Sequence, residues 1–122
     1  MSRMLKQGVG WRLGYDPSEL KFCGLMGTAD WAVELTRAEL ADFRRLLLEL
    51  VGTLQSLAKE LMPEEKIEIE AESDLVWLAV QGQVAVYELR FILQNGERRC
   101  EGHFPPEVVP ELIAAIKTLE AF

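Results

Sequence analysis

The chain has 122 residues, 49% of them hydrophobic and 27% charged, with a formal net charge of −7 and a pI near 4.8. These values are typical of a globular protein and predict one domain over residues 1–122. The negative charge disfavours non-specific binding to nucleic acid phosphates and to anionic membranes.

We expect a cytoplasmic protein. No run reaches the roughly 18 apolar residues of a membrane span, and residues 1–10 lack the apolar core of a secretory signal. Two cysteines, Cys23 and Cys100, make no disulfide framework in a chain of this length. The sequence therefore predicts no contact with a membrane.

Short strands separated by glycines and turns are predicted in the first third of the chain. They cover residues 9–15, 21–26 and 31–35, and residues 4–7 are a possible fourth. The sequence Asp16-Pro17-Ser18 is favourable for a turn after the first of them.

A long amphipathic helix is predicted over residues 36–62. Thr36 and Glu39 have the spacing of a capping box, and Pro63 prevents continuation of the helix. Apolar residues recur at alternating intervals of three and four, which places them on one helix face that must be buried. This stripe consists of Leu40, Phe43, Leu47, Leu50, Leu54, Leu57 and Leu61.

Four more strands and a shorter helix are predicted in the second half. Strict alternation over Ile67–Ser73 indicates a half-buried strand, and the more uniformly apolar Leu75–Gln81 predicts a central one. Asn95-Gly96 is typical of a type I′ hairpin turn between the last two strands, 84–94 and 97–104. The terminal helix is predicted over 106–121, with an apolar face of Val109, Leu112, Ile113, Ile116 and Leu119.

The two halves, 1–62 and 63–122, thus share one plan of strands followed by a helix. Such an order predicts an α+β fold with two antiparallel sheets packed against a long central helix and a C-terminal helix. An intermolecular coiled coil formed by the long stripe is the alternative.

No motif for catalysis, cofactor binding or metal binding is recognised. The single histidine, His103, forms only an isolated Cys-x-x-His with Cys100, whereas a structural zinc site needs a second pair. The glycines of residues 8–14 precede no helix and lack the Gly-Lys-Ser/Thr of a phosphate loop. We therefore expect a non-enzymatic protein without cofactors.

Two charged regions are interpreted differently. Glutamates 68, 70 and 72 alternate along one strand, which predicts the solvated outer face of a sheet. Trp11, Arg12 and Tyr15 lie in a more basic region and combine aromatic rings with a cation, as single-stranded nucleic acid binding requires. The net charge weighs against this second interpretation.

Four segments, Gln7–Pro17, Trp31–Thr36, Glu72–Trp77 and Arg98–Gly102, resemble a family of small uncharacterised proteins from cyanobacteria and plastids. The resemblance covers nearly the whole chain. It implies a fold like that of the Whirly-type single-stranded-DNA-binding transcriptional regulators, in which two units of four strands and a helix pair around packed helices. No DNA-binding residue is carried over from that family, because the sheet faces predicted here are acidic.

The functional hypothesis is a small acidic interaction or regulatory module with a protein partner or a second copy of itself. The alternative is a single-stranded nucleic-acid-binding regulator that uses Trp11, Arg12 and Tyr15. Gly96 and Gly102 are predicted to serve folding, the first at positive φ in the hairpin and the second at a strand bulge or a close backbone approach.

Overall fold

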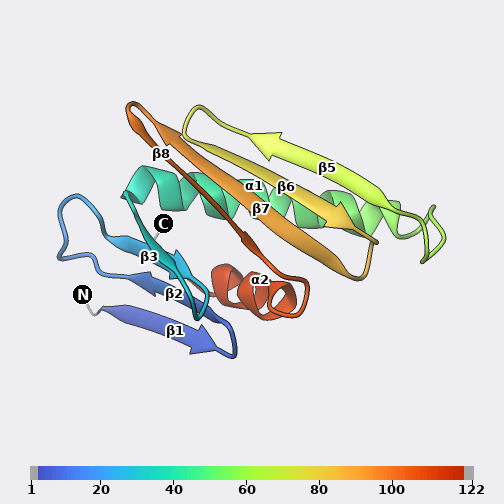
Figure 1. Cartoon of the computed structure of the whole chain (residues 1–122), viewed down its shortest axis with the longest axis horizontal. Coiled ribbons are helices and arrows are strands. Elements are labelled where there is room, and N and C mark those ends of the chain that lie inside the picture. The colour runs from blue at the N-terminus through green and yellow to red at the C-terminus, as the bar shows by residue number, and fades with distance from the viewer. Residues whose placement is uncertain (1–2, 120–122) are drawn as a thin grey trace.

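The computed structural model describes residues 3–119 as two four-stranded antiparallel sheets and two helices (Figure 1). Both sheets are meanders, in the orders β1-β2-β3-β4 and β5-β6-β7-β8. This confirms the predicted α+β class, including the strand at residues 4–7. The elements are β1 (Met4–Gly8), β2 (Trp11–Tyr15), β3 (Gly24–Gly27), β4 (Ala32–Leu35), α1 (Arg37–Leu57), β5 (Ile67–Glu72), β6 (Val76–Gly82), β7 (Tyr87–Asn95), β8 (Arg98–Phe104) and α2 (Val109–Lys117).

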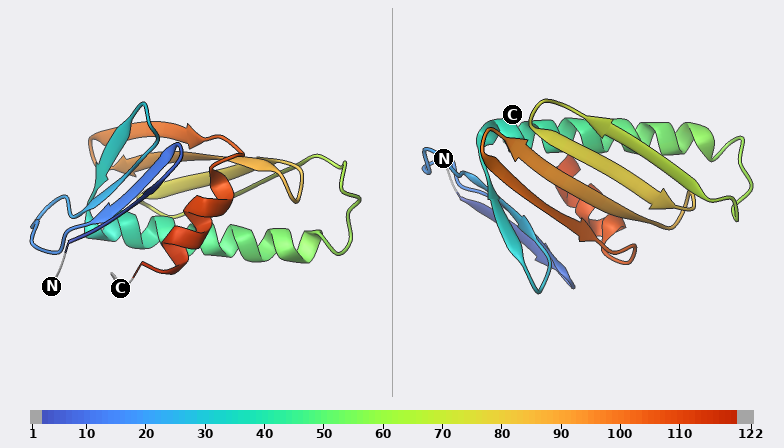
Figure 2. Two further views of the ribbon diagram at one scale, coloured as in Figure 1. Left: turned by 90° about the horizontal axis from the view of Figure 1, so that it is seen from below. Right: turned by 45° about the horizontal axis from the view of Figure 1, so that its top comes forward.

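Each helix packs against the sheet of the other half. Helix α1, from the first half, packs against β5 and β6 and lies under the second sheet (Figure 2). Helix α2, from the second half, packs against β2 as well as β7. The Trp11 Nε1 of β2 donates a 2.9 Å hydrogen bond to Glu111 of α2. Because of this exchange, both sheets share one hydrophobic core.

Helix α1 begins as predicted. The Thr36 hydroxyl accepts from the Glu39 backbone N–H at 3.1 Å, and the Glu39 carboxylate accepts from the Thr36 N–H at 2.8 Å. These reciprocal bonds satisfy two backbone donors that have no partner within the helix. Five stripe residues are at most 3% exposed, which confirms the predicted burial for Leu40, Phe43, Leu47, Leu50 and Leu54.

Helix α1 ends at Leu57, so the predicted end near Met62 is wrong. Residues 58–61 continue as a tight turn in which the Leu61 N–H donates to the Leu57 carbonyl. Leu57 and Leu61 are only half-buried, and Met62 is 60% exposed. The stripe therefore extends beyond the surface that covers it, and the helix loses the tertiary packing that would stabilise another turn.

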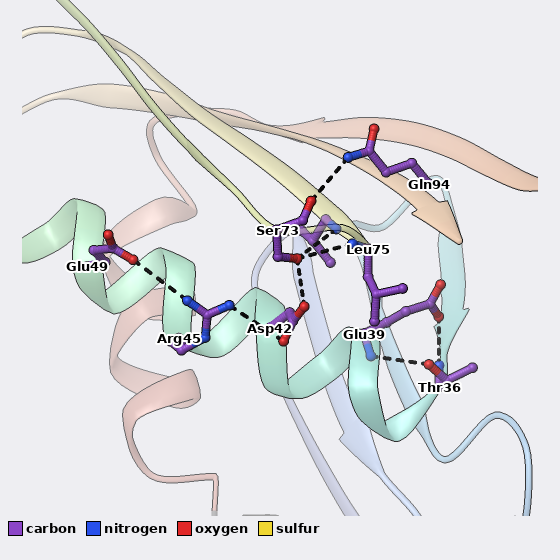
Figure 3. A network of polar contacts seen from close by, with 9 residues as sticks. Thr36, Glu39, Asp42, Arg45, Glu49, Ser73, Leu75 and Gln94 are labelled. Atoms are coloured by element: carbon purple, nitrogen blue, oxygen red, sulfur yellow. Dashed lines mark hydrogen bonds and ion pairs between the residues drawn. The ribbon is translucent and has the colours of Figure 1, made fainter. Parts of the chain in front are cut away.

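A polar network fastens α1 to the second sheet (Figure 3). Asp42 of α1 accepts a 2.6 Å hydrogen bond from the Ser73 hydroxyl, in the turn between β5 and β6. That hydroxyl also accepts from the backbone N–H groups of Leu75 and Val76. The Gln94 amide of β7 donates to the Ser73 carbonyl at 3.3 Å. The network orders this turn and fixes the sheet relative to the helix.

Helix α2 begins later than the prediction of residue 106. Residues 105–108 form a turn closed by the Val108 N–H and the Pro105 carbonyl, and Pro110 occupies the first turn of the helix, where its missing N–H costs nothing. The helix ends at Lys117. The prediction that it continues through residues 118 and 119 is therefore wrong, and the predicted end at residue 121 lies outside the described residues. The predicted apolar face of α2 is buried, which confirms that part of the prediction.

The two glycines assigned to folding have different outcomes. Gly96 has φ +66°, as the hairpin turn requires, and this prediction is confirmed. A bulge at Gly102 is wrong, since β8 pairs with β7 without interruption. Gly102 instead allows a close approach: a methyl group there would lie 3.0 Å from the Phe91 ring and 3.2 Å from the Trp31 indole.

Candidate functional site: the outer face of the second sheet

The second sheet has one face on α1 and one face to solvent. Alternation along its strands turns Val76, Leu78 and Val80 toward the helix, so that their neighbours in sequence point outward. Within residues 3–119, no helix covers this outer face (Figure 2). The strands place these outward side chains in cross-strand rows: Glu68, Gln81 and Glu88; Glu70, Ala79, Arg90 and His103; Glu72, Trp77, Ile92 and Glu101.

Charge on this outer face is strongly acidic. Five glutamates from β5, β7 and β8 stand against two arginines, Arg90 and Arg99. The alternating glutamates of β5 are exposed while their neighbours are half-buried, which confirms the predicted solvated outer face. The face therefore carries a negative potential toward solvent.

Trp77 is the large aromatic residue in the middle of this face. Its indole Nε1 donates a 3.1 Å hydrogen bond to Glu70 on β5, and Ile92 is its cross-strand neighbour on β7. Both side chains are half-buried, and Ala79 on the same face is only 5% exposed. Sequence analysis missed this residue, although it falls between two inward-facing residues and so had to point outward.

A groove of about 430 Å³ crosses β7 and β8 beside this aromatic residue. Glu88, Arg90 and Ile92 contribute from β7, and Glu101 and His103 from β8. The two carboxylates lie in different rows, separated by the row of Arg90 and His103. Along the strands, the groove therefore presents Glu88, then Arg90, then Glu101, which is a negative, a positive and a negative charge. Trp77 lies at one side of the groove.

A second hollow adjoins the groove where the two sheets meet. It is a cleft of about 540 Å³ lined by Trp31 and His103 together with residues of three turns. His103 lines both hollows and lies on β8, the edge strand of the second sheet. The Trp31 indole packs against Phe91 and Phe104, with ring centroids 5.6 and 5.3 Å apart.

The opposite end of β8 is held to the first half by an ion pair whose carboxylate, but not its guanidinium, is fully buried. Arg98 donates to the fully buried carboxylate of Glu39 and to the Glu34 carbonyl, and its guanidinium lies 4.9 Å from the Phe22 ring centroid. The second carboxylate oxygen of Glu39 has no hydrogen-bond partner among the described residues. Burial raises the pKa of the neighbouring Cys100 thiol. This ion pair positions β8, and so the groove, relative to the first sheet.

The residues predicted for nucleic acid binding are buried or hydrogen-bonded within the protein. Trp11 and Tyr15 are 8% and 5% exposed, and Trp11 is bonded to Glu111. Arg12 points to the other face of β2, where its guanidinium donates 3.2 Å hydrogen bonds to the carbonyls of Thr28 and Trp31. The structure therefore does not bring the three side chains together on one exposed surface.

His103, Cys23 and Cys100 are residues of the sequence that could take part in metal binding or thiol chemistry. Among residues 3–119, no group of three or more His, Cys, Asp or Glu side chains is placed to hold a metal ion. Cys23 and Cys100 are free thiols, the first buried and the second half-buried. Neither helix of the described chain is long and apolar enough to cross a membrane.

Comparison with known proteins gives a family. The model of the family described as "Domain of unknown function (DUF1818)" matches residues 6–119. The chain belongs to this family. Comparison of the DUF1818 chain with curated proteins finds no match.

Among solved structures, the DUF1818 chain is similar to a Prochlorococcus sp. NATL2A protein, which is described as a protein with unknown function from the DUF155 family in a crystal structure at 1.80 Å resolution. The TM-score is 0.90 at 28% identity, covering 96% of this chain and 98% of the other. These findings support the predicted uncharacterised, cyanobacterial-type family. Plastid members and a Whirly-type fold stay predictions.

Proposed function

We propose that this DUF1818 protein is a non-enzymatic interaction module that docks a basic, extended segment of a protein partner. The docking surface is the outer face of the second sheet. The observation that carries the proposal is the groove that joins Trp77 to Glu88 and Glu101 on an acidic face. Aromatic residues that line such a groove supply much of the binding energy at protein interfaces.

The arrangement of charge suits several separate ion pairs with an extended chain. Glu88 and Glu101 belong to rows two apart, or about 13 Å along the strands at the rise of a β-strand. Two cations four residues apart on an extended segment would span the same distance. The net charge of −7 would speed the encounter with such a segment by electrostatic steering.

A peptide titration tests this proposal. The probe is a fluorescein-labelled decapeptide of alternating lysine and threonine, and the comparison peptide alternates glutamate and threonine. We expect fluorescence anisotropy to report binding of the lysine peptide alone, with an affinity that falls as salt is added. Trp77→Ala should weaken that affinity about tenfold or more.

Charge variants separate the docking face from the total charge of the protein. Glu88→Gln with Glu101→Gln removes two charges from the groove, whereas the matched control, Glu64→Gln with Glu65→Gln, removes two from the exposed turn after α1. Equal loss of affinity in both pairs would show attraction by net charge alone and would overturn the proposal. A melting curve of each variant confirms that it is folded.

A labelled single-stranded oligonucleotide is the third arm of the titration. The twofold plan of four strands and a helix is what supports the Whirly-like alternative. Tight oligonucleotide binding that Trp11→Ala abolishes, with no binding of the lysine peptide, would replace the proposed function by that alternative.

A further inference from the structure

The cleft between the two sheets has walls from three separate stretches of the chain, 9–10, 28–31 and 103–108. Val9 and Gly10 belong to the β1–β2 turn, Asp30 and Trp31 to the β3–β4 turn, and His103 to the end of β8. Pro105, Glu107 and Val108, in the turn that leads into α2, line the cleft as well. The volume of about 540 Å³ lies within the range of small-molecule sites, which is about 300–1,000 Å³.

The walls of the cleft are held in place without a ligand. Gly10 has φ +85°, and a methyl group there would lie 2.9 Å from the Val108 side chain, so the hairpin tip packs closely on the turn before α2. The Trp31 indole packs against the rings of Phe91 and Phe104, which hold it in position. A ligand would therefore find these walls already formed, which lowers the cost of binding.

Arg12 orders the turn that carries the charged wall. Its guanidinium donates to the carbonyls of Thr28 and Trp31, both at 3.2 Å. Within the turn, the Thr28 N–H donates to the Trp31 carbonyl at 2.9 Å, and the Asp30 N–H donates to the Thr28 hydroxyl at 3.2 Å. The guanidinium is engaged with backbone, whereas Asp30, which lines the cleft, is exposed.

The lining combines apolar surface with negative charge. Trp31, Pro105 and Val108 supply apolar surface, and the carboxylates come from Asp30 and Glu107. No lysine or arginine is among the described residues that line the cleft. An indole together with carboxylates attracts an organic cation, and apolar walls favour one with an aliphatic stem.

We infer that this cleft binds an alkylammonium group, namely the side chain of one lysine of the docked segment. The inference rests on the proposed function, because His103 lines both the groove and the cleft, so a segment docked along β8 in the groove lies beside the cleft. The aliphatic stem of the lysine packs along Trp31 and Val108, and its ammonium group pairs with Asp30 and Glu107.

A small probe tests the cleft separately from the docking face. The probe is Nα-acetyl-lysine methylamide, and the comparison compound is Nα-acetyl-norleucine methylamide, which has an aliphatic side chain without the ammonium group. The chain has three tryptophans, so ¹⁵N–¹H spectra contain three indole signals, which Trp31→Phe and Trp77→Phe assign. We expect the lysine probe to shift the Trp31 signal saturably at millimolar concentration, and the norleucine compound to bind at least about fivefold more weakly.

Two conservative variants and a control complete the design. Asp30→Asn with Glu107→Gln should weaken binding of the lysine probe about fivefold or more. Glu101 lines the groove but not the cleft, so Glu101→Gln should leave binding of the lysine probe unchanged. Asp30 and Glu107 are both exposed, so we expect these variants to fold. An unshifted Trp11 indole signal in each variant checks this.

The outcomes distinguish the inference from the proposed function. If the decapeptide binds the wild type and the Asp30→Asn/Glu107→Gln variant equally well and the Trp31 signal does not move, the inference is overturned and the docking function stands. Equal affinity for the lysine and norleucine compounds would overturn it as well. If the lysine probe shifts Trp31 but the decapeptide does not bind, the proposed function is overturned, and the assignment of a docked lysine falls with it.

Discussion

The two sheets have the same topology, but their outer faces carry different kinds of side chain. The outer face of the first sheet has Leu5, Gly14, Leu25 and Glu34 in one cross-strand row, and its Arg12 is turned back onto backbone carbonyls. The outer face of the second sheet carries five glutamates around Trp77. The shared strand order therefore sets the architecture, while the outward residues of each sheet are free to differ.

The strands of the second sheet are also longer, and this has a consequence for the surface. Its β7 covers Tyr87–Asn95, whereas β3 and β4 of the first sheet have four residues each. Longer strands give more rows on each face, so the second sheet can cover α1 on one side and still present an extended surface on the other. The predictions below test how far the two sheets differ.

The largest effect is expected where α1 supports the second sheet. Leu47→Ala should lower the free energy of unfolding by about 3 kcal/mol, because the side chain is fully buried and its loss leaves a cavity. Leu61→Ala, in the half-buried end of the same stripe, should cost less than about 1 kcal/mol. Urea denaturation measures both, and equal losses would mean that the whole stripe is buried in solution.

Gly102→Ala should destabilise by about 1–3 kcal/mol, since the added methyl group overpacks the space between the Phe91 ring and Trp31. The first sheet has a matched control in Gly14→Ala, whose added methyl group would meet its neighbours at ordinary distances of 3.4 Å or more. Thermal unfolding of the two variants makes the comparison. A larger loss at Gly14 would contradict the packing described for the junction of the sheets.

Gly96→Val should cost about 1–2 kcal/mol through backbone strain alone, because φ is +66° and open space surrounds the residue. Peptide binding should survive at temperatures where the variant is folded, since the hairpin tip lies outside the groove. Loss of binding without loss of stability would make the tip part of the docking surface.

The smallest effect is expected in the pH dependence of stability. A hydrogen bond from Ser18 lowers the pKa of Asp16, beside the first sheet, so its contribution is present above the ordinary value of 3.8 and is lost as the pH falls through the lowered value. Burial raises the pKa of Cys100 and of Tyr87 in the second sheet. Stability should therefore decline above their ordinary values of 9.0 and 10.0, where the unfolded chain releases these protons first.

Asp16→Asn should flatten only the acid limb of this profile, and Cys100→Ala with Tyr87→Phe only the alkaline limb. Chemical denaturation at a series of pH values checks both limbs. If Cys100→Ala with Tyr87→Phe leaves the alkaline limb unchanged, the titration of other groups causes that limb.

Local signals made the architecture predictable. The capping box of Thr36 and Glu39 and the Asn95-Gly96 turn act over a few residues, and the buried stripe is a periodicity within one helix. The end of α1 was mispredicted because Leu57 and Leu61 fit the period, whereas burial depends on how far the second sheet extends.

The candidate site was less accessible to sequence analysis because it depends on long-range packing. The role of Trp11 is set by Glu111, 100 residues away, once α2 packs on β2. The cleft joins turns from both halves around Trp31. Two features of the outer face had a local signal. The alternation of β5 predicted its exposed glutamates, and the outward position of Trp77 follows from its place between Val76 and Leu78, although the apolar run of that strand concealed it.

The most direct test of the docking claim is a chemical-shift map of both sheets on addition of the unlabelled lysine–threonine decapeptide. The account predicts that the Trp77 indole and the amides of β7 and β8 around Arg90 and His103 shift saturably, while those of Leu5, Gly14 and Leu25 do not. Shifts confined to the first sheet, or no shifts at all at millimolar peptide, would contradict it.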